Sequence, residues 1–308
     1  MVDLGLLFNF FFMFGAILLA GALSGYLSER VGIVNIGIDG MMCMGAIFFG
    51  IYSAPLLKMS NVGPGMLVFP LIFTMISTMI MGLLHAFATI KLRANHIISG
   101  TAINMIGLAL ATFLNNPLAR LLDGGATRLI SGFGSYGYLG GGIYLSSITM
   151  FILVAIIAVA IYVFMHYTKT GLRYRTVGEN PNAVDAQGIS VIKYQWIGVL
   201  LSSALAGLAG AIFLFNVQTF GGNTAGLGFL ALAIMVAGAW TVEWISVISV
   251  CFALLTALSN TTILPNIGIP KEVTFAIPYI VTIVVLLAFS KRSLAPAHDG
   301  IPFDKTKR

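Results

Sequence analysis

Charged side chains are scarce in this sequence. Aspartate, glutamate, lysine and arginine make up 8% of the 308 residues, against 58% hydrophobic residues. Soluble globular proteins carry about 25% charged residues. So few charges cannot cover a water-facing surface, and most of the surface must therefore face lipid. The net charge of +6 comes from basic residues clustered between apolar runs, a pattern typical of membrane topology. We expect contacts with lipid and no nucleic-acid partner.

Cysteine and ligand-binding motifs are also sparse. The two cysteines, Cys43 and Cys251, both lie inside apolar runs, so we predict no disulfide. The sequence contains no G-x-x-x-x-G-K-[ST] phosphate loop, so the chain cannot bind ATP in that way. The four histidines are scattered without metal-ligand spacing, and no nucleophile is paired with a base. We expect no metal, no cofactor and no catalytic site on this chain.

Long apolar runs dominate what is present. A membrane-spanning helix needs about 20 mostly apolar residues, and nine runs come close to this length or exceed it. They are 5–27, 33–52, 66–90, 97–116, 143–167, 194–216, 226–242, 244–262 and 273–290. The sequence therefore predicts an all-α, polytopic membrane protein with about nine transmembrane helices, or eight to ten at the limits, in a single domain over 1–308. Asp39 and several glycines leave open whether 33–52 is broken, and 226–242 is short enough to be re-entrant.

The basic residues predict the orientation of the chain. With nine spans, alternate loops place 12 of the 16 lysines and arginines on one side of the membrane. Because cytoplasmic loops carry the excess of basic residues, the N-terminus is expected outside and the C-terminus in the cytoplasm. Small residues recur every four positions in the sixth run, at Ser203, Gly207 and Ala211. This spacing predicts close helix packing.

The longest basic loop, 168–192, has coherent local signals. Asn180 is a good N-cap, Pro181 suits the first helical position and Gly188 suits the position just after a helix end. The short helix between them is marginal in water. It therefore needs packing, either on its own membrane domain or on a partner. The alternative is that the loop only joins two spans and its bases anchor the cytoplasmic face.

Polar side chains inside apolar runs are candidates for function because they are costly in lipid. The expected substrate-pathway residues are Asn35, Asp39, Asn104, Asn216 and Gln218. Asp39 is the only carboxylate deep within a run. It has either a structural or gating role or a direct contact with substrate, and its flanking glycines suit a cap on a half-helix beside a cavity.

Three stretches resemble a known family. Residues 171–189, Gly-Leu-Arg-Tyr-Arg-Thr-Val-Gly-Glu-Asn-Pro-Asn-Ala-Val-Asp-Ala-Gln-Gly-Ile, resemble the coupling loop of ABC-importer permeases of the branched-chain amino acid and simple-sugar group. Residues 28–42 and 92–104 resemble the nucleoside-importer branch of that group. Asp39 stands where that branch more often has glutamate, and His96 departs from its pattern.

The resemblance implies a transport subunit rather than an enzyme. A short helix in 168–192 would dock in a groove of a separate ATP-binding subunit. The residues implied in this coupling are Arg173, Gly178, Glu179, Asn180, Pro181 and Ala183. The other implied partners are a second permease chain, identical or paralogous, and an extracytoplasmic substrate-binding lipoprotein, in the plasma membrane of a prokaryote.

The resemblance favours nucleosides as substrate. The same type of importer for simple sugars or branched-chain amino acids is the first alternative. An ATP-independent secondary transporter or channel is the alternative from another class. The coupling-like loop argues against it, as does the lack of paired intramembrane charges.

Overall fold

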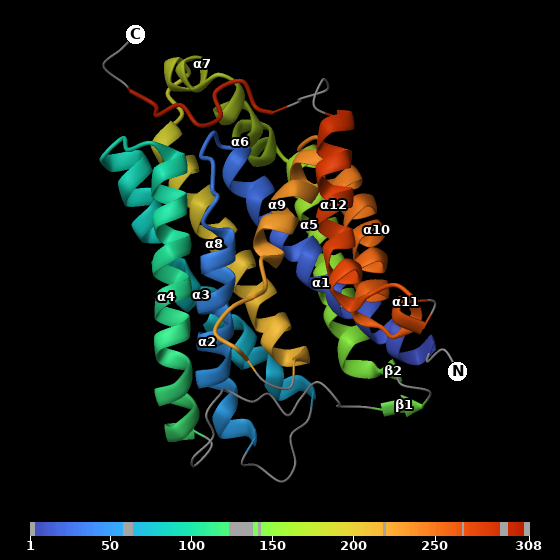
Figure 1. Cartoon of the computed structure of the whole chain (residues 1–308). Coiled ribbons are helices and arrows are strands. Elements are labelled where there is room, and N and C mark those ends of the chain that lie inside the picture. Colours follow the sequence, from blue (N-terminus) through green and yellow to red (C-terminus); the bar gives the residue numbers. More distant parts are fainter. Residues whose placement is uncertain are drawn as a thin grey trace.

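The computed structural model describes residues 4–57, 64–122, 138–140, 143–217, 220–266, 268–289 and 295–304. Long helices run side by side between two ends of a bundle (Figure 1). Within these ranges, seven helices are long and apolar enough to cross a membrane. They are α1 (Leu4–Glu29), α2 (Ile38–Leu57), α3 (Val68–Ala86), α4 (His96–Leu122), α5 (Leu145–Tyr167), α8 (Val191–Asn216) and α10 (Val242–Asn260). A polytopic helical membrane protein, as the sequence predicts, is therefore confirmed.

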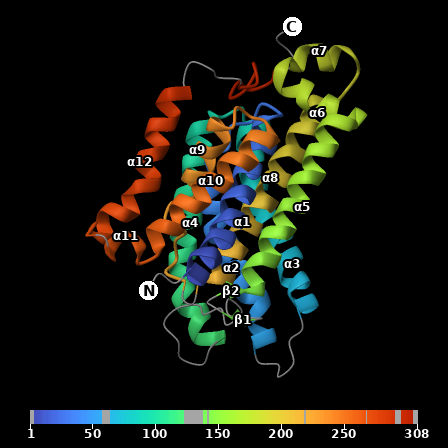
Figure 2. The same cartoon turned by 90° about the vertical axis from the view of Figure 1, so that its right-hand side faces the viewer.

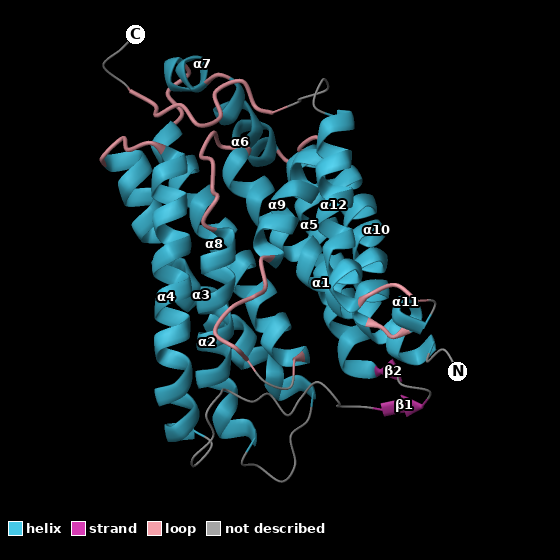
Figure 3. Cartoon of the chain, in the orientation of Figure 1, coloured by secondary structure: helices cyan, strands magenta, loops and turns pink. Residues whose placement is uncertain are grey.

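Shorter elements complete the chain. Two more apolar helices are α9 (Leu227–Ala237) and α12 (Lys271–Phe289), and two polar helices are α6 (Lys169–Glu179) and α7 (Pro181–Ala186). The remaining pieces are η1 (Pro64–Leu67), the π-helical turn η2 (Phe87–Lys91), α11 (Ile263–Asn266) and the antiparallel strands β1 (Tyr138–Gly140) and β2 (Ile143–Tyr144). Figure 3 shows that helices make up nearly all of the described fold.

Six of the nine apolar runs, the first to the sixth, coincide with long helices, and the eighth coincides with α10. The second run is interrupted, because α2 begins only at Ile38 and the chain before it is extended or turned. The seventh run contains only the 11 residues of α9. Figure 1 shows that the chain reaches α9 from the lower end of α8, and α9 then continues to the upper end. This course takes irregular chain followed by a short helix across the bundle.

Helices α1 and α8 form the centre of the bundle. Both are largely buried, and each packs against several other helices. They cross at a hydrogen-bonded pair, because the Ser24 hydroxyl donates to the Ser202 carbonyl over 2.8 Å. The small residues predicted in the sixth run are buried on α8 and face other helices, since Gly82 of α3 abuts Ser203 and Gly45 of α2 abuts Gly207, which confirms the expected close packing. Small side chains allow helix backbones to approach closely where lipid supplies no hydrophobic drive.

The segments α1–α2 and α8–α9 repeat one another in inverted orientation (Figures 1 and 2). Helix α1 rises, breaks and is followed by the descending α2, whereas α8 descends, breaks and is followed by the rising α9 (Figures 1 and 2). Gly21 of α1 abuts Ala231 of α9, and Gly210 of α8 abuts Met42 of α2. Gly210 lies 189 positions after Gly21, and Ala231 lies the same number after Met42. The two contacts are therefore equivalent under a pseudo-twofold axis, an arrangement that many transporters share.

Candidate functional site

Asp39 lies where the two broken crossings meet. It belongs to the first turn of α2 and is 8% exposed. Its Oδ1 accepts hydrogen bonds from the Thr224 hydroxyl over 2.8 Å and from the Gly228 backbone N–H over 2.9 Å. Gly228 is in the first turn of α9, so one carboxylate lies at the N-terminal ends of both α2 and α9. Each helix N-terminus carries roughly half a positive charge, and the carboxylate offsets both.

Gly228 lies 189 positions after Asp39, the shift that relates α1–α2 to α8–α9. The residue and its counterpart therefore touch at the pseudo-twofold axis itself. A Cβ atom at position 228 would overlap the Asp39 backbone, so only glycine permits this approach. Sequence reasoning identified Asp39 but missed both Gly228 and Thr224. The glycine-rich stretch at 221–228 was the available signal.

Asn104 holds the break before α2 in place. Its Nδ2 donates to the Ile36 carbonyl over 2.6 Å, and its Oδ1 accepts from the Gly40 N–H over 2.7 Å. The amide thus supplies hydrogen-bond partners to the Ile36 carbonyl and the Gly40 N–H, which the break leaves without partners in a helix. This bonding answers the requirement that backbone polar groups inside a membrane be satisfied.

Asn35 lies at the same break, within the non-helical segment before α2. It is fully buried, its Nδ2 donates to the Ser202 hydroxyl over 3.0 Å, and its Oδ1 accepts from the Gly37 N–H over 3.1 Å. Asn216 lies apart, at the end of α8, where its Oδ1 accepts from the Ser147 hydroxyl over 2.9 Å. Gln218 lies outside the described residues. The structure therefore gathers Asn35, Asp39 and Asn104 around the α2 break and leaves Asn216 at the far end.

A second cluster of features occupies the end that carries α6 and α7, hereafter the α6–α7 end. The Asn180 side chain accepts from the Ala183 N–H over 3.0 Å and Pro181 begins α7, while Gly188 has a φ of +77°. The expected short helix and its cap are thus present. The 11-residue helix α6 before it was not predicted. It is capped by Thr168 and is anchored by Tyr174, whose hydroxyl donates to the Leu27 carbonyl.

Arg30 connects the α6–α7 end to the break before α2 and to the turn after α9. Its guanidinium donates to the Trp240 carbonyl over 2.6 Å and forms an ion pair with Glu179 over 3.4 Å. The Trp240 indole N–H in turn donates to the buried Glu29 carboxylate over 2.6 Å. Glu179, at the end of α6, is therefore mechanically linked to both broken crossings.

The C-terminal segment, residues 295–304, lies across the same end (Figure 1). The His298 N–H donates to the Gly178 carbonyl over 2.9 Å, and Asp304 pairs with Arg93 over 2.7 Å. Asp299 shares a hydrogen bond with Glu29. Burial raises the pKa of the Asp299 carboxyl to about 7, because removal from water disfavours the charged form. In the described residues, no three His, Cys, Asp or Glu side chains are grouped to hold a metal ion.

Comparison with known proteins gives the family. The model of the branched-chain amino acid transport system / permease component family matches residues 6–286. The chain belongs to this family. It is the membrane-spanning permease subunit of an ABC importer, a multi-pass bacterial membrane protein without a catalytic role. The family implies an ATPase and a binding protein as partners.

Curated relatives match the permease over nearly its whole length. The nucleoside ABC transporter permease protein NupC of Lactococcus lactis is 35% identical, covering 93% of this chain and 92% of its own. The guanosine ABC transporter permease protein NupQ of Bacillus subtilis is 34% identical, covering 96% and 95%. An uncharacterised protein of Mycoplasma genitalium, MG121, is 37% identical over the full length of both chains. No solved structure matches significantly.

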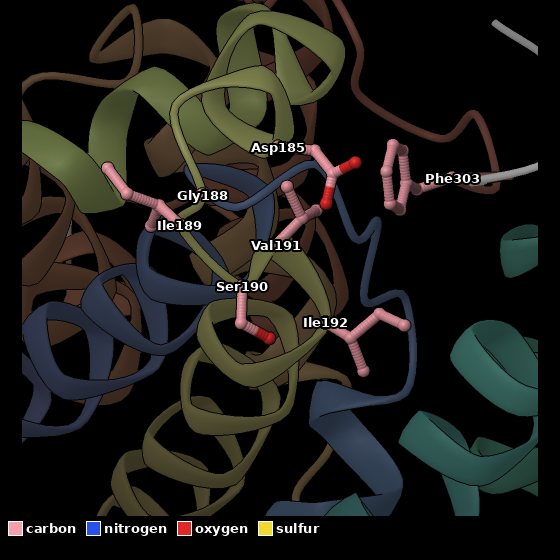
Figure 4. Close-up of a pocket in the computed structure, with 7 residues that line it drawn as sticks. All are labelled: Asp185, Gly188, Ile189, Ser190, Val191, Ile192 and Phe303. Carbon is pink, nitrogen blue, oxygen red and sulfur yellow. The ribbon is translucent and has the colours of Figure 1, made fainter.

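In the permease, the α6–α7 end presents both exposed and recessed surface. Arg173, Glu179 and Ala183 are exposed, whereas Gly178 and Pro181 are buried. A pocket of about 180 Å³ opens beside α7. Figure 4 shows its lining, from Asp185 of α7 through Ser190 to Phe303 of the C-terminal segment. The buried residues thus hold the helix in place, and the exposed ones form the outer surface of this end.

Proposed function

We propose that this permease imports nucleosides that an extracytoplasmic binding lipoprotein delivers, together with a second permease chain and a separate ATPase. The relatives with named substrates at about 35% identity over most of the chain are a nucleoside and a guanosine permease. This is the observation that carries the substrate assignment. The alternatives, sugars and branched-chain amino acids, become outcomes of the experiment below.

The charge balance around Asp39 supports a neutral substrate. Unpartnered half-helix N-termini attract anions, but here the carboxylate already offsets both ends. Within the described spanning helices, lysine and arginine occur only in the first or last turns. A phosphorylated solute would therefore find no cation inside the membrane. Nucleosides are uncharged, and they meet this condition.

We propose nine crossings, with the N-terminus outside and the C-terminus in the cytoplasm. The seven long helices, α12, and α9 together with the chain that precedes it make up this number. Arg30, Arg93 and the basic residues of α6 lie at the α6–α7 end, whereas Arg120 and Lys271 lie at the opposite end. This distribution favours a cytoplasmic α6–α7 end.

We assign Asp39 to gating and the helix α7 to coupling. The Asp39 bonds tie α2 to α9, so opening a path between these helices requires their rupture. Asn35 and Asn104 fix the backbone on one side of that path, with Asn216 at the end of α8. The exposed face of α7 with Ala183 and the exposed Arg173 and Glu179 would meet the ATPase. The Arg30–Glu179 ion pair would carry its movement toward the two breaks.

The experiment is competition for uptake in cells with and without the gene. We expect labelled guanosine to enter only cells with the gene. We expect unlabelled uridine or inosine to compete, and ribose, glucose and leucine not to compete. Competition by a sugar or by leucine, with no effect of nucleosides, would replace the substrate class and leave the importer assignment in place.

A further inference from the structure

A crevice of about 430 Å³ lies between α1, α8, α9, α10 and α12, at the end of the bundle opposite α6 and α7. Figure 2 shows α12 at the edge of the bundle. The volume falls within the range of about 300–1,000 Å³ that small-molecule sites occupy. No sequence motif pointed to this place, because its walls come from four distant parts of the chain.

Aromatic rings make up much of the wall. They come from α1, α8 and α12, and they are Phe10, Phe14, Phe213, Phe275 and Tyr279. Tyr279 and Phe275 are 41% and 51% exposed, so both side chains are accessible from outside the chain. Flat heterocycles stack on such rings with little dependence on their identity.

Three polar side chains face the same crevice from one side of α10. Thr256, Ser259 and Asn260 all line it from the last two turns of that helix. Thr256 and Ser259 each donate the hydroxyl proton, and Asn260 donates one of its two amide N–H groups, to a carbonyl one turn earlier in α10. Their oxygens are left as hydrogen-bond acceptors. The lining contains no lysine, arginine, aspartate or glutamate, so the site suits an uncharged ligand that donates hydrogen bonds.

We infer that this crevice is a binding site for a neutral nucleoside, with the base against the aromatic wall and the ribose hydroxyls or base N–H groups on the α10 acceptors. The inference rests on the proposed function and identifies where its substrate binds. It departs from the sequence-based expectation that asparagines of the α2 break line the pathway, since the amides of Asn35 and Asn104 are bonded to the chain itself.

The crevice also adjoins the Asp39 site. The Tyr279 hydroxyl donates to the Ala225 carbonyl over 2.8 Å, and Ala225 has a φ of +54°. Leu227, which begins α9, lines the crevice, and the next residue donates to Asp39. A ligand in the crevice would therefore contact the start of α9, which is also hydrogen-bonded to the Asp39 carboxylate.

The direct test is protection of a cysteine by substrate. The variant Asn260→Cys, in a chain with Cys43 and Cys251 replaced by alanine, is labelled with a membrane-impermeant maleimide in the assembled complex, with and without excess guanosine. We expect guanosine to slow labelling at least fivefold and leucine to have no effect. The matched control is Asn266→Cys in α11, which does not line the crevice, and its labelling should not change. Ser259→Cys serves if Asn260→Cys assembles poorly.

Uptake separates failure of this inference from failure of the proposed function. In a complex that imports guanosine, Asn260→Leu and Tyr279→Leu should each slow uptake about five- to a hundredfold, because each removes one contact to the ligand. Asn266→Leu should not. Suppose that the wild type imports nucleosides, that guanosine does not protect the Asn260→Cys variant, and that both leucine variants transport normally. The crevice is then rejected as the binding site, and the proposed function stands. Absence of nucleoside uptake by the wild type would reject the proposed function.

Discussion

Substitution of Gly228 by alanine tests the junction between the two broken crossings. The added methyl group would overlap the Asp39 backbone, which has no flexible side-chain end that could move aside. The ends of α2 and α9 must therefore separate. Overpacking of this kind costs about 1–3 kcal/mol. The separation also strains the 2.9 Å bond from the Gly228 N–H to the carboxylate, and a bond to a charged group contributes about 1.5–3 kcal/mol.

Together these terms predict a loss of about 2.5–6 kcal/mol in the free energy of unfolding. For a chain of this size, each kcal/mol lowers the melting temperature by roughly 2–4 °C, so a fall of roughly 5–25 °C is expected. The assay is thermal unfolding of the purified permease in detergent, followed by tryptophan fluorescence.

Gly221→Ala is the matched control, because a Cβ atom at position 221 meets open space. It should melt within about 1 °C of the wild type. Equal melting temperatures for Gly228→Ala and Gly221→Ala would refute the close approach of α2 and α9 at Asp39.

Three further predictions concern the α6–α7 end. Ala183→Arg should abolish uptake while the chain still reaches the membrane, because an unpaired charge buried in a partner groove costs about 3–5 kcal/mol; normal uptake would reject α7 as the docking helix. Asp299 has a pKa raised from 3.8 to about 7 in the docked C-terminal segment, so docking is favoured when the carboxyl is protonated and weakens as the pH rises through that range. From pH 5.5 to pH 8 the docking constant should fall, seen as faster exchange of the His298 amide after correction for intrinsic rates. Asp299→Asn should weaken this dependence. For topology, Arg173→Cys should react with an impermeant reagent only after permeabilisation and Lys271→Cys in intact cells, and the reverse pattern would invert the proposed orientation.

Much of the fold was predictable because its signals are local. Apolar runs of sufficient length mark the long helices, and Asn180, Pro181 and Gly188 mark the ends of α7 within a few residues. The helix α6 escaped prediction because Gly171 and Gly178 suggest breaks. In the structure both glycines permit close contact, with the chain at Phe164 and at Arg30 respectively.

The site was predictable only in part, because its bonds join distant segments. Asp39 stands out as a carboxylate in an apolar run, but its partner Thr224 lies 185 residues away. Asn104 was expected beside substrate, and the structure shows its amide bonded to backbone 64 and 68 residues away. A single sequence shows that such a side chain needs a partner, and it does not show which one.

The permease is proposed to move nucleosides when ATP is hydrolysed on a separate chain. The most direct measurement is accumulation of labelled guanosine in proteoliposomes that contain the permeases and the ATPase, with the binding lipoprotein added to the outer face. We predict accumulation that requires both ATP on the cytoplasmic side and the lipoprotein. Guanosine entry that is equally fast without ATP, or no entry while glucose or leucine accumulates, would contradict the account.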